Sequence, residues 1–292
     1  MKTGQPYTFA GLPDCPERQA RFCILPLPYE ATVTYQTGTK FGPEGVLLAS
    51  RYLELYDEEI DREPCEAGIR TLPEMLPEHA GPKQMVEEIE KAADAIVADG
   101  RVVVGIGGEH TVSVGVVKAC VRRFAPLRVL HLDAHADLRD AYKGTPYSHG
   151  CVVRRMLDAG CAVSSVGIRS VSREEMEFLR NGRPALSVAW AYEMSAGWEE
   201  RISSTLPGGA YYITIDVDFF DPAAVPDTGT PEPGGFFWNE TVRFLRNFIA
   251  REDVSIVGFD VVELAPRNLY SPSCFFVAKL VYKIIGYAGG RR

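Results

Sequence analysis

Carboxylates and imidazoles gather at three points of the chain, each directly after a run of apolar residues. The stretch VLHLDAHADL (129–138) carries Asp133, His135 and Asp137 at alternate positions. A strand places alternate residues on one face, and removing three such groups from water is costly unless a cation lies between them. The other two groups are Glu109 with His110, and Asp216, Asp218 and Asp221 in IDVDFFDP (215–222).

Together these residues predict a site for divalent cations. Two histidines and four aspartates form a ligand set that is rich in hard oxygen donors and contains no thiolate, which suits manganese better than zinc. More than four ligands indicates more than one ion, and two ions about 3.5–4 Å apart are a known arrangement for hydrolysis. Glu109 and Asp221 are expected to hold loops instead, because Asp221 directly precedes Pro222 and is typical of a turn.

The elements that position these residues alternate between strands and helices. The alternation predicts an α/β fold with three αβα layers, in which helices cover both faces of a central, mostly parallel sheet. The carboxyl ends of parallel strands meet at one edge, so the three groups are expected to converge, and we expect one domain over 1–292. The predicted strands are 22–29, 101–110, 127–135, 162–168, 209–218 and 255–263, and the predicted helices are 42–59, 81–100, 111–124, 150–160, 172–181, 190–205, 238–251 and 271–290.

The composition narrows the class of protein. Lys and Arg number 31 against 39 Asp and Glu, a net charge of −8 that argues against nucleic-acid binding and mildly suits a small cationic substrate. Seven scattered cysteines form no CxxC pair, which is typical of a reduced chain. The N-terminus has no apolar signal-peptide core and no segment is long enough to span a membrane. We therefore expect a cytoplasmic protein that binds no membrane.

Five segments resemble the ureohydrolase family, which includes arginase and agmatinase. A sixth, LPYEATVTYQTGTKFGPEGVLLAS (27–50), is similar to the entrance segment of agmatinases, so the resemblance spans nearly the whole chain. It implies the arginase-like αβα fold and a homo-oligomer, either a trimer or a hexamer. The five segments are GGEHT (107–111), DAHADL (133–138), SHG (148–150), DVDFFDPAAVPDTGTPEPGG (216–235) and GFDVVELAP (258–266).

The resemblance also implies a pair of manganese ions. In the family the nucleophile is a hydroxide held between the metals, in agreement with the general expectation that paired cations lower the pKa of water. Asp137 would accept a hydrogen bond from that hydroxide and pass its proton on. Carried over to this chain, the ligands are His110 and Asp137 for the first ion, His135 and Asp218 for the second, and Asp133 and Asp216 for both.

Three further residues match substrate positions of the family. Glu263 matches the carboxylate that grips the guanidinium group, and Thr230 lies where a hydroxyl or backbone group orients the same end. His149 matches a histidine at the mouth that relays a proton to the leaving amine, a task that suits a side chain whose ordinary pKa is near neutrality. Two histidines lie outside the pattern. We expect His131 to be packed and His79 to be exposed.

The expected reaction is hydrolysis of a guanidine to urea and an amine, with agmatine as the leading substrate and putrescine as the product, a step of polyamine biosynthesis. Arginase holds the amino-acid end of arginine with an asparagine-bearing loop, whereas the loop LRDAYKGTPY (138–147) contains no asparagine. This difference favours agmatine, whose far ammonium group could be received by Asp140, Glu30 or another acidic side chain. Arg139 leaves open a guanidine that carries a carboxylate, such as guanidinobutyrate.

Two other classes of protein are alternatives. A formiminoglutamate hydrolase would keep the same two-metal cluster, while a deacetylase-like hydrolase with one zinc ion would not need four metal-binding aspartates. A non-catalytic binder of guanidines or polyamines would be expected to lack one of the ligands, and all six are present.

Overall fold

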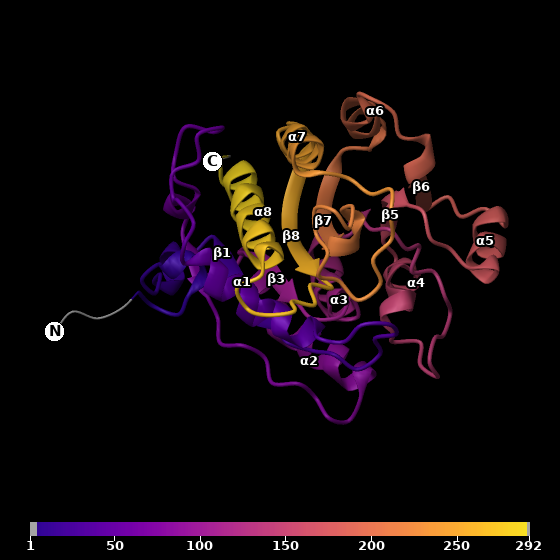
Figure 1. Ribbon diagram of the computed structural model, residues 1–292, viewed down its shortest axis with the longest axis horizontal. Helices are drawn as coiled ribbons and strands as arrows, with labels where there is room; N and C mark the ends of the chain where they lie inside the picture. Colours follow the sequence, from indigo (N-terminus) through magenta and orange to yellow (C-terminus); the bar gives the residue numbers. More distant parts are fainter. Residues whose placement is uncertain (1–4, 291–292) are drawn as a thin grey trace.

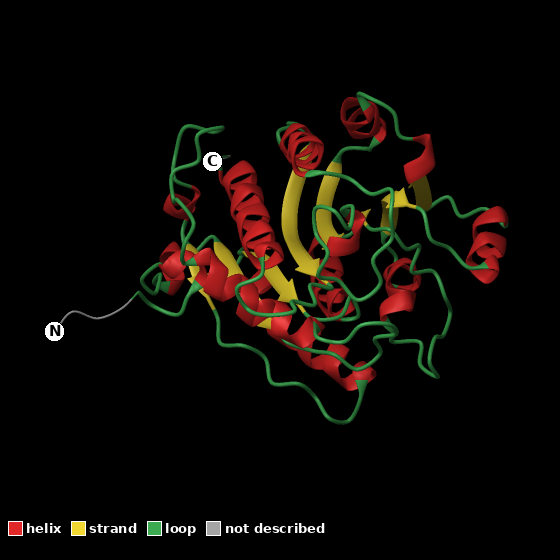
Figure 2. Ribbon diagram, in the orientation of Figure 1, coloured by secondary structure: helices red, strands yellow, loops and turns green. Residues whose placement is uncertain are grey.

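The computed structural model describes residues 5–290, which form a single sheet of eight strands with helices around it. Every pair of neighbouring strands is parallel, in the order β2-β1-β3-β8-β7-β4-β5-β6. Figure 2 shows the strands as a central layer enclosed by helices, so the predicted α/β fold is confirmed. The strands are β1 (Phe22–Leu27), β2 (Ile69–Thr71), β3 (Val102–Gly107), β4 (Leu127–Leu132), β5 (Ala162–Ile168), β6 (Leu186–Trp190), β7 (Gly209–Asp216) and β8 (Val254–Val262).

Helices cover both faces of the sheet (Figure 1). One face packs against α1 (Gly42–Ser50), α6 (Trp198–Thr205), α7 (Trp238–Ile249) and α8 (Pro272–Gly289). The opposite face packs against α2 (Pro82–Ala98), α3 (Val112–Phe124), α4 (Val152–Asp158) and α5 (Arg173–Arg180). Short 3₁₀ helices lie at Phe9–Gly11, Glu17–Gln19, Thr39–Phe41, Pro64–Ala67, His149–Cys151, Ala191–Glu193 and Val217–Phe219.

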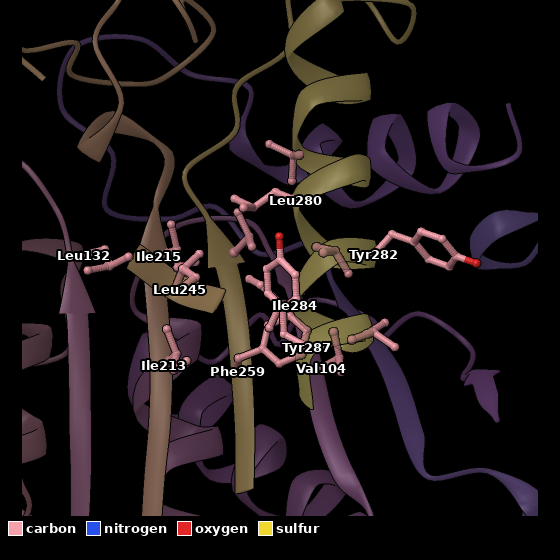
Figure 3. Close-up of a cluster of buried hydrophobic side chains, with 14 of the residues drawn as sticks. Val104, Leu132, Ile213, Ile215, Leu245, Phe259, Leu280, Tyr282, Ile284 and Tyr287 are labelled. Atoms are coloured by element: carbon pink, nitrogen blue, oxygen red, sulfur yellow. The ribbon is translucent and has the colours of Figure 1, made fainter. Parts of the chain in front are cut away.

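The apolar core explains why the central strands read as nearly continuous apolar runs. Side chains of the strands, among them Val104 and Phe259, meet Leu245 of α7 and Ile284 of α8 in a fully buried layer (Figure 3). A second layer forms on the other face of the same strands, so both faces need apolar residues. Burying each large apolar side chain contributes roughly 1.5–3 kcal/mol, which holds the sheet rigid beneath its loops.

One predicted strand and one predicted helix end earlier than expected, with consequences for the structure. The strand predicted for 127–135 ends at Leu132, so Asp133, His135 and Asp137 lie in the loop beyond β4 and do not share one strand face. The helix predicted for 42–59 ends at Ser50. After it, the chain turns to bring the buried carboxylate of Asp57 within 2.8 Å of Lys283 on α8, which a continuous helix would prevent.

Both edge strands of the sheet escaped prediction. Strand β2 has only three residues, and the side chains of β6 are partly exposed, so neither shows an uninterrupted apolar run. The predicted helix 190–205 begins at Trp198, because the residues before it complete β6 and a 3₁₀ turn. Within residues 5–290, no helix combines the length and the apolar character that crossing a bilayer requires.

Candidate metal centre and active site

The site lies at the carboxyl ends of four adjacent strands, β3, β8, β7 and β4. His110 follows β3, Glu263 follows β8, Asp216 ends β7 and Asp133 follows β4. Strands β3 and β4 are consecutive in the chain but are separated in the sheet by β8 and β7. Loops that leave such neighbouring strands in different directions open a crevice, which is where open parallel sheets bind ligands.

His110 directs its ring nitrogen Nδ1 at three carboxylates. This atom lies 3.0 Å from Asp137 Oδ2, 3.2 Å from Asp133 Oδ2 and 3.5 Å from Asp216 Oδ2. Nevertheless it is buried and makes no hydrogen bond with any described residue. The other ring nitrogen, Nε2, lies 2.9 Å from the hydroxyl of Thr214, which holds the ring in place. A buried nitrogen that lies close to several carboxylates but makes no hydrogen bond fits a position where a cation binds.

His135 and Asp218 form a second group of candidate metal ligands beside the first. His135 Nδ1 lies 2.8 Å from Asp218 Oδ2 and 3.6 Å from Asp133 Oδ1. Asp133 therefore offers one oxygen to each imidazole, and the two groups of ligand atoms share this residue. The backbone N–H of Ala134 donates to Asp218 Oδ1 over 3.0 Å and fixes that carboxylate. This geometry suits two cations bridged by a carboxylate.

His131 is a buried neighbour of the cluster that contacts Asp133. Its Nε2 lies 2.8 Å from Asp133 Oδ2 and its Nδ1 lies 3.0 Å from Ser165 Oγ, so both ring nitrogens already have partners. The ring is fully buried, which confirms the prediction of a packed histidine. His79 is exposed, as predicted.

The electrostatics of the cluster also favour bound cations. Burial raises the pKa of Asp216 and Glu263 well above the usual carboxyl range. Burial, followed by the charge of Asp133, raises the pKa of Asp137 to about 6. Burial opposes ionisation of Asp133 as well, but the neighbouring imidazoles hold its pKa well below the usual range. Several carboxylates confined without solvent are costly, and a pair of divalent cations would offset that cost.

Two site residues have a left-handed backbone conformation that side chains rarely adopt. Asp137 has a φ of 51° and Glu263 a φ of 64°. Neighbouring contacts hold Glu263 in place, because its N–H donates to Gly108 O over 2.8 Å and its Oε1 accepts from the N–H of His110 over 2.6 Å. Backbone strain of this kind costs about 1–3 kcal/mol and is concentrated at functional sites.

A cavity of 290 Å³ opens above the cluster. It brings together four of the six predicted ligands and all three predicted substrate residues, while Asp133 and Asp218 lie beneath its wall. Residues that sequence analysis did not assign to the site also line it, including Glu175 and Tyr142. The one sequence signal for Glu175 is the S-x-x-E pattern of 172–175, which marks a helix start and forms a capping box in the structure. The predicted residues on the wall are His110, His135, Asp137, His149, Asp216, Thr230 and Glu263.

The two acidic residues suggested for the far ammonium group are engaged elsewhere. Asp140 is 66% exposed and lies 2.9 Å from Arg155. Glu30 accepts hydrogen bonds from the N–H of Gly38 and the hydroxyl of Thr39. Neither residue lines the cavity, so neither is placed to receive the ammonium group.

The prediction that Glu109 and Asp221 hold loops is confirmed. Asp221 accepts from the backbone N–H groups of Ala223 (2.9 Å), Gly234 (2.9 Å) and Gly235 (3.1 Å), which folds the segment after β7 back on itself. Glu109 is fully buried and accepts from the backbone of the entrance segment 27–50.

Comparisons with known proteins agree with this geometry. Residues 20–286 match the family model described as "Arginase family". The chain is 39% identical over 278 residues to the N(1)-aminopropylagmatine ureohydrolase of Synechocystis sp., with 92% of this chain and 90% of that protein covered. It is 35% identical to the agmatinase of Halalkalibacterium halodurans, with 87% of this chain and 86% of the relative covered. The crystal structure of the agmatine ureohydrolase of Thermoplasma volcanium matches with a TM-score of 0.82 and 29% identity, covering 92% of this chain and 90% of that one. The chain therefore belongs to the arginase family and is a hydrolase of the ureohydrolase type.

Proposed function

We propose that the protein hydrolyses agmatine to urea and putrescine with two manganese ions. The observation that carries the proposal is the placement of His110 Nδ1 and His135 Nδ1 against carboxylates that share Asp133. This cluster adjoins a cavity that Glu263 also lines. A guanidinium group paired with that carboxylate would lie beside the metal pair.

The six predicted ligands would hold the ions. His110 and Asp137 would hold one ion and His135 and Asp218 the other, while Asp133 and Asp216 would serve both. The oxygen-rich donor set favours manganese, because hard oxygen donors suit this ion, although affinity alone would not select it. When bound, the pair would lower the pKa of a water molecule and polarise the guanidinium group.

The remaining steps belong to side chains of this protein. Glu263 can form a planar, two-pronged ion pair with the guanidinium group, and Thr230 lies on the same cavity wall. Burial, and then the positive charges of His135 and His110, lower the pKa of His149 to about 4. A neutral imidazole at this place can take up a proton and pass it to the leaving amine.

The proposal extends to the residue that would bind the amine end of the substrate. Glu175 is a buried acidic side chain on the cavity wall outside the metal cluster, and its carboxylate already accepts hydrogen bonds from Leu138 and Ser172. Unlike Asp140 and Glu30 it lines the cavity, so its negative charge would attract an amine-bearing tail. The similarity to an N(1)-aminopropylagmatine ureohydrolase makes the aminopropyl derivative of agmatine a further candidate substrate, with the same guanidine and a longer tail.

A second candidate substrate is a guanidine with a carboxylate, such as guanidinobutyrate. Arg139 lines the cavity, its guanidinium group lies 4.6 Å above the ring of Tyr142, and it makes no ion pair within residues 5–290. A cationic side chain without an acidic partner on this wall would attract an anionic tail and repel an ammonium group.

The resemblance to the family extends the proposal further. It supports a trimer or hexamer of this chain, and the single sheet supports one domain over 1–292. The scattered cysteines, which are typical of a reduced chain, support a cytoplasmic location.

Urea release from purified, manganese-loaded protein tests the proposal. Agmatine, N(1)-aminopropylagmatine, guanidinobutyrate and arginine are offered separately, and formamide release from formiminoglutamate is measured in parallel. We expect urea with the highest kcat/KM for agmatine. Urea from a different guanidine would keep the reaction and change the substrate, whereas two bound metal ions without urea from any guanidine would refute the proposal.

A further inference from the structure

The entrance segment crosses the end of β3 at a point where only glycine fits. A Cβ added to Gly108 would lie 2.0 Å from the carbonyl oxygen of Tyr29. The close approach is fixed by hydrogen bonds of 2.8 Å from Gly108 N to Leu27 O and from Glu109 N to Tyr29 O. It places Thr32, a residue without an assigned role, against His149, which lines the cavity.

Thr32 connects a buried carboxylate to the histidine of the cavity. Its hydroxyl oxygen lies 2.9 Å from Glu109 Oε1, 3.0 Å from Nδ1 of His149 and 3.1 Å from the backbone nitrogen of His149. Thr32 is 5% exposed and Glu109 is fully buried, so water does not compete for these contacts.

The direction of each hydrogen bond follows from the partners of Glu109. Its carboxylate accepts from the N–H groups of Ala31 (2.5 Å) and Thr32 (2.6 Å) and from the hydroxyl of Thr111 (2.7 Å). A carboxylate that receives donors on both oxygens also accepts the hydroxyl proton of Thr32. The oxygen of Thr32 then has only lone pairs left, and it must accept from both the backbone N–H and the ring Nδ1 of His149.

We infer that Thr32 is a positioning residue that fixes the tautomer of His149, with the proton on Nδ1 and the lone pair on Nε2. In a neutral imidazole the hydrogen bond of one nitrogen decides which nitrogen carries the proton. The competing contact to Ser148 Oγ is longer, at 3.5 Å, and within residues 5–290 Nε2 has no hydrogen-bond partner. Tyr142 packs against the imidazole in a T-shaped arrangement, with 5.7 Å between the ring centroids, and restricts the ring further.

The consequence concerns proton transfer to the leaving amine, so this inference rests on the proposed function. His149 lines the cavity, and a bare Nε2 there can take up a proton without any rearrangement of the ring. With the opposite tautomer, the lone pair would face Thr32 and the imidazole could not act as the base.

Three variants test the inference by steady-state kinetics. Thr32→Val keeps the shape but removes the hydroxyl, Thr32→Ser keeps the hydroxyl, and Ser148→Ala removes the competing contact. We expect Thr32→Val to lower kcat about 10- to 100-fold with KM changed less than about twofold and both metal ions retained. Thr32→Ser should stay within about threefold and Ser148→Ala within about twofold of wild type. Equal kcat in Thr32→Val and wild type would overturn the inference, as would a Thr32→Ser variant no better than Thr32→Val.

Neutron diffraction of the metal-loaded wild-type crystal gives a readout that does not depend on turnover or on the folding of a variant. Deuterium on Nδ1 of His149 supports the inference, and deuterium on Nε2 alone overturns it. The two proposals fail separately. A wild-type protein without urea release refutes the proposed function even with Nδ1 protonated, whereas an active wild type with the proton on Nε2 refutes only the role of Thr32.

Discussion

Glu232 Oε1 lies 3.7 Å from Nε2 of His135, while Nδ1 of the same ring lies 2.8 Å from Asp218 Oδ2. The imidazole thus lies between a carboxylate of the metal cluster and a second carboxylate outside it. Metal-binding histidines commonly have such an outer carboxylate, which orients the ring and strengthens its donor nitrogen.

Glu232→Gln is therefore expected to weaken metal binding at the position of His135. The change keeps the size of the side chain and removes its charge, and outer partners of this kind contribute about 10-fold or more to metal affinity. We expect the affinity for one of the two manganese ions to fall about 10-fold, measured by metal content after dialysis against buffered manganese. Glu200→Gln, at an exposed position of α6, is the control. Equal manganese affinity in the two variants would contradict the assignment.

Asp133→Asn tests the shared ligand. One oxygen of Asp133 faces each imidazole of the cluster. An amide in its place replaces one of these oxygens by an NH2 group, which cannot bind a cation, and removes the negative charge that both ions would share. We expect loss of at least one bound ion and a decrease in urea release of about 100-fold or more. Asp140→Asn removes an exposed carboxylate that pairs with Arg155 and should leave both metal content and activity unchanged. An Asp133→Asn protein that keeps two ions and a comparable rate would exclude the bridging role.

The central part of the fold could be predicted because its strands are buried on both faces. VVVGIG of β3 is an uninterrupted apolar run for this reason. The edge strand β2 is IRT, half-exposed and only three residues long, so its sequence carries no periodic signal. The alternate spacing of Asp133 and Asp137 indicated a strand, but the chain continues as a loop in which Asp137 adopts a φ of 51°. Such a conformation depends on tertiary contacts and leaves no periodic pattern.

The site also contains residues that the sequence could predict and residues that it could not. Motifs with short, fixed spacing identified the residues around the cavity, and the structure brings them together. Thr32 could not be found from sequence, because its partner His149 lies 117 positions away and only the crossing of the entrance segment over β3 joins them. Glu232 was part of a recognised motif, but its meaning depends on the orientation of the His135 ring.

Lys283→Met should destabilise the fold without affecting chemistry. The ammonium group of Lys283 lies 2.8 Å from Asp57 Oδ1 and 3.0 Å from Glu59 Oε2, and Asp57 is fully buried. Removing one partner of a buried pair leaves the other charge uncompensated, so we expect a loss of about 3 kcal/mol in the free energy of unfolding, measured with urea denaturation. Lys279→Met on the same helix should change it by less than about 0.5 kcal/mol. A Lys283→Met protein as stable as wild type would show that the pair adds nothing to the fold.

Arg139→Gln distinguishes the two classes of substrate. The positive charge of Arg139 on the cavity wall repels an ammonium tail and attracts a carboxylate. We expect KM to fall roughly threefold for agmatine and to rise roughly 10-fold for guanidinobutyrate, measured by urea release. Lys143→Gln is the control, since this lysine lies on the same loop but donates to Val33 O and does not line the cavity. Equal changes in KM for both substrates would show that Arg139 does not discriminate between substrates by the charge of the tail.

The metal-free protein should lose stability as the pH rises. Asp216 and Glu263 have pKa values raised well above the usual range by burial, and that of Asp137 is raised to about 6. A carboxyl group with a higher pKa in the folded than in the unfolded state binds more protons when folded. Its contribution to stability is complete below about pH 4 and disappears as the pH rises through the folded value. The pKa of Asp133 is shifted in the opposite direction, so this residue stabilises the fold when it is ionised. That contribution to stability is complete above about pH 4 and stays constant at higher pH.

The two metal-site imidazoles act in the same direction, because nearby aspartates raise their pKa against the effect of burial. His149, whose pKa is lowered to about 4, acts in the opposite direction up to about pH 6.5, but it is one group against five. The Tm of chelator-treated protein should therefore fall between about pH 5 and pH 8. Manganese binds the deprotonated carboxylates, so the increase in Tm that it produces should grow over the same range. Differential scanning calorimetry of metal-free and loaded samples at matched pH measures both curves. A metal-free Tm that rises with pH, or a manganese effect that does not change with pH, would mean that the buried carboxylates are not the groups that bind the metal.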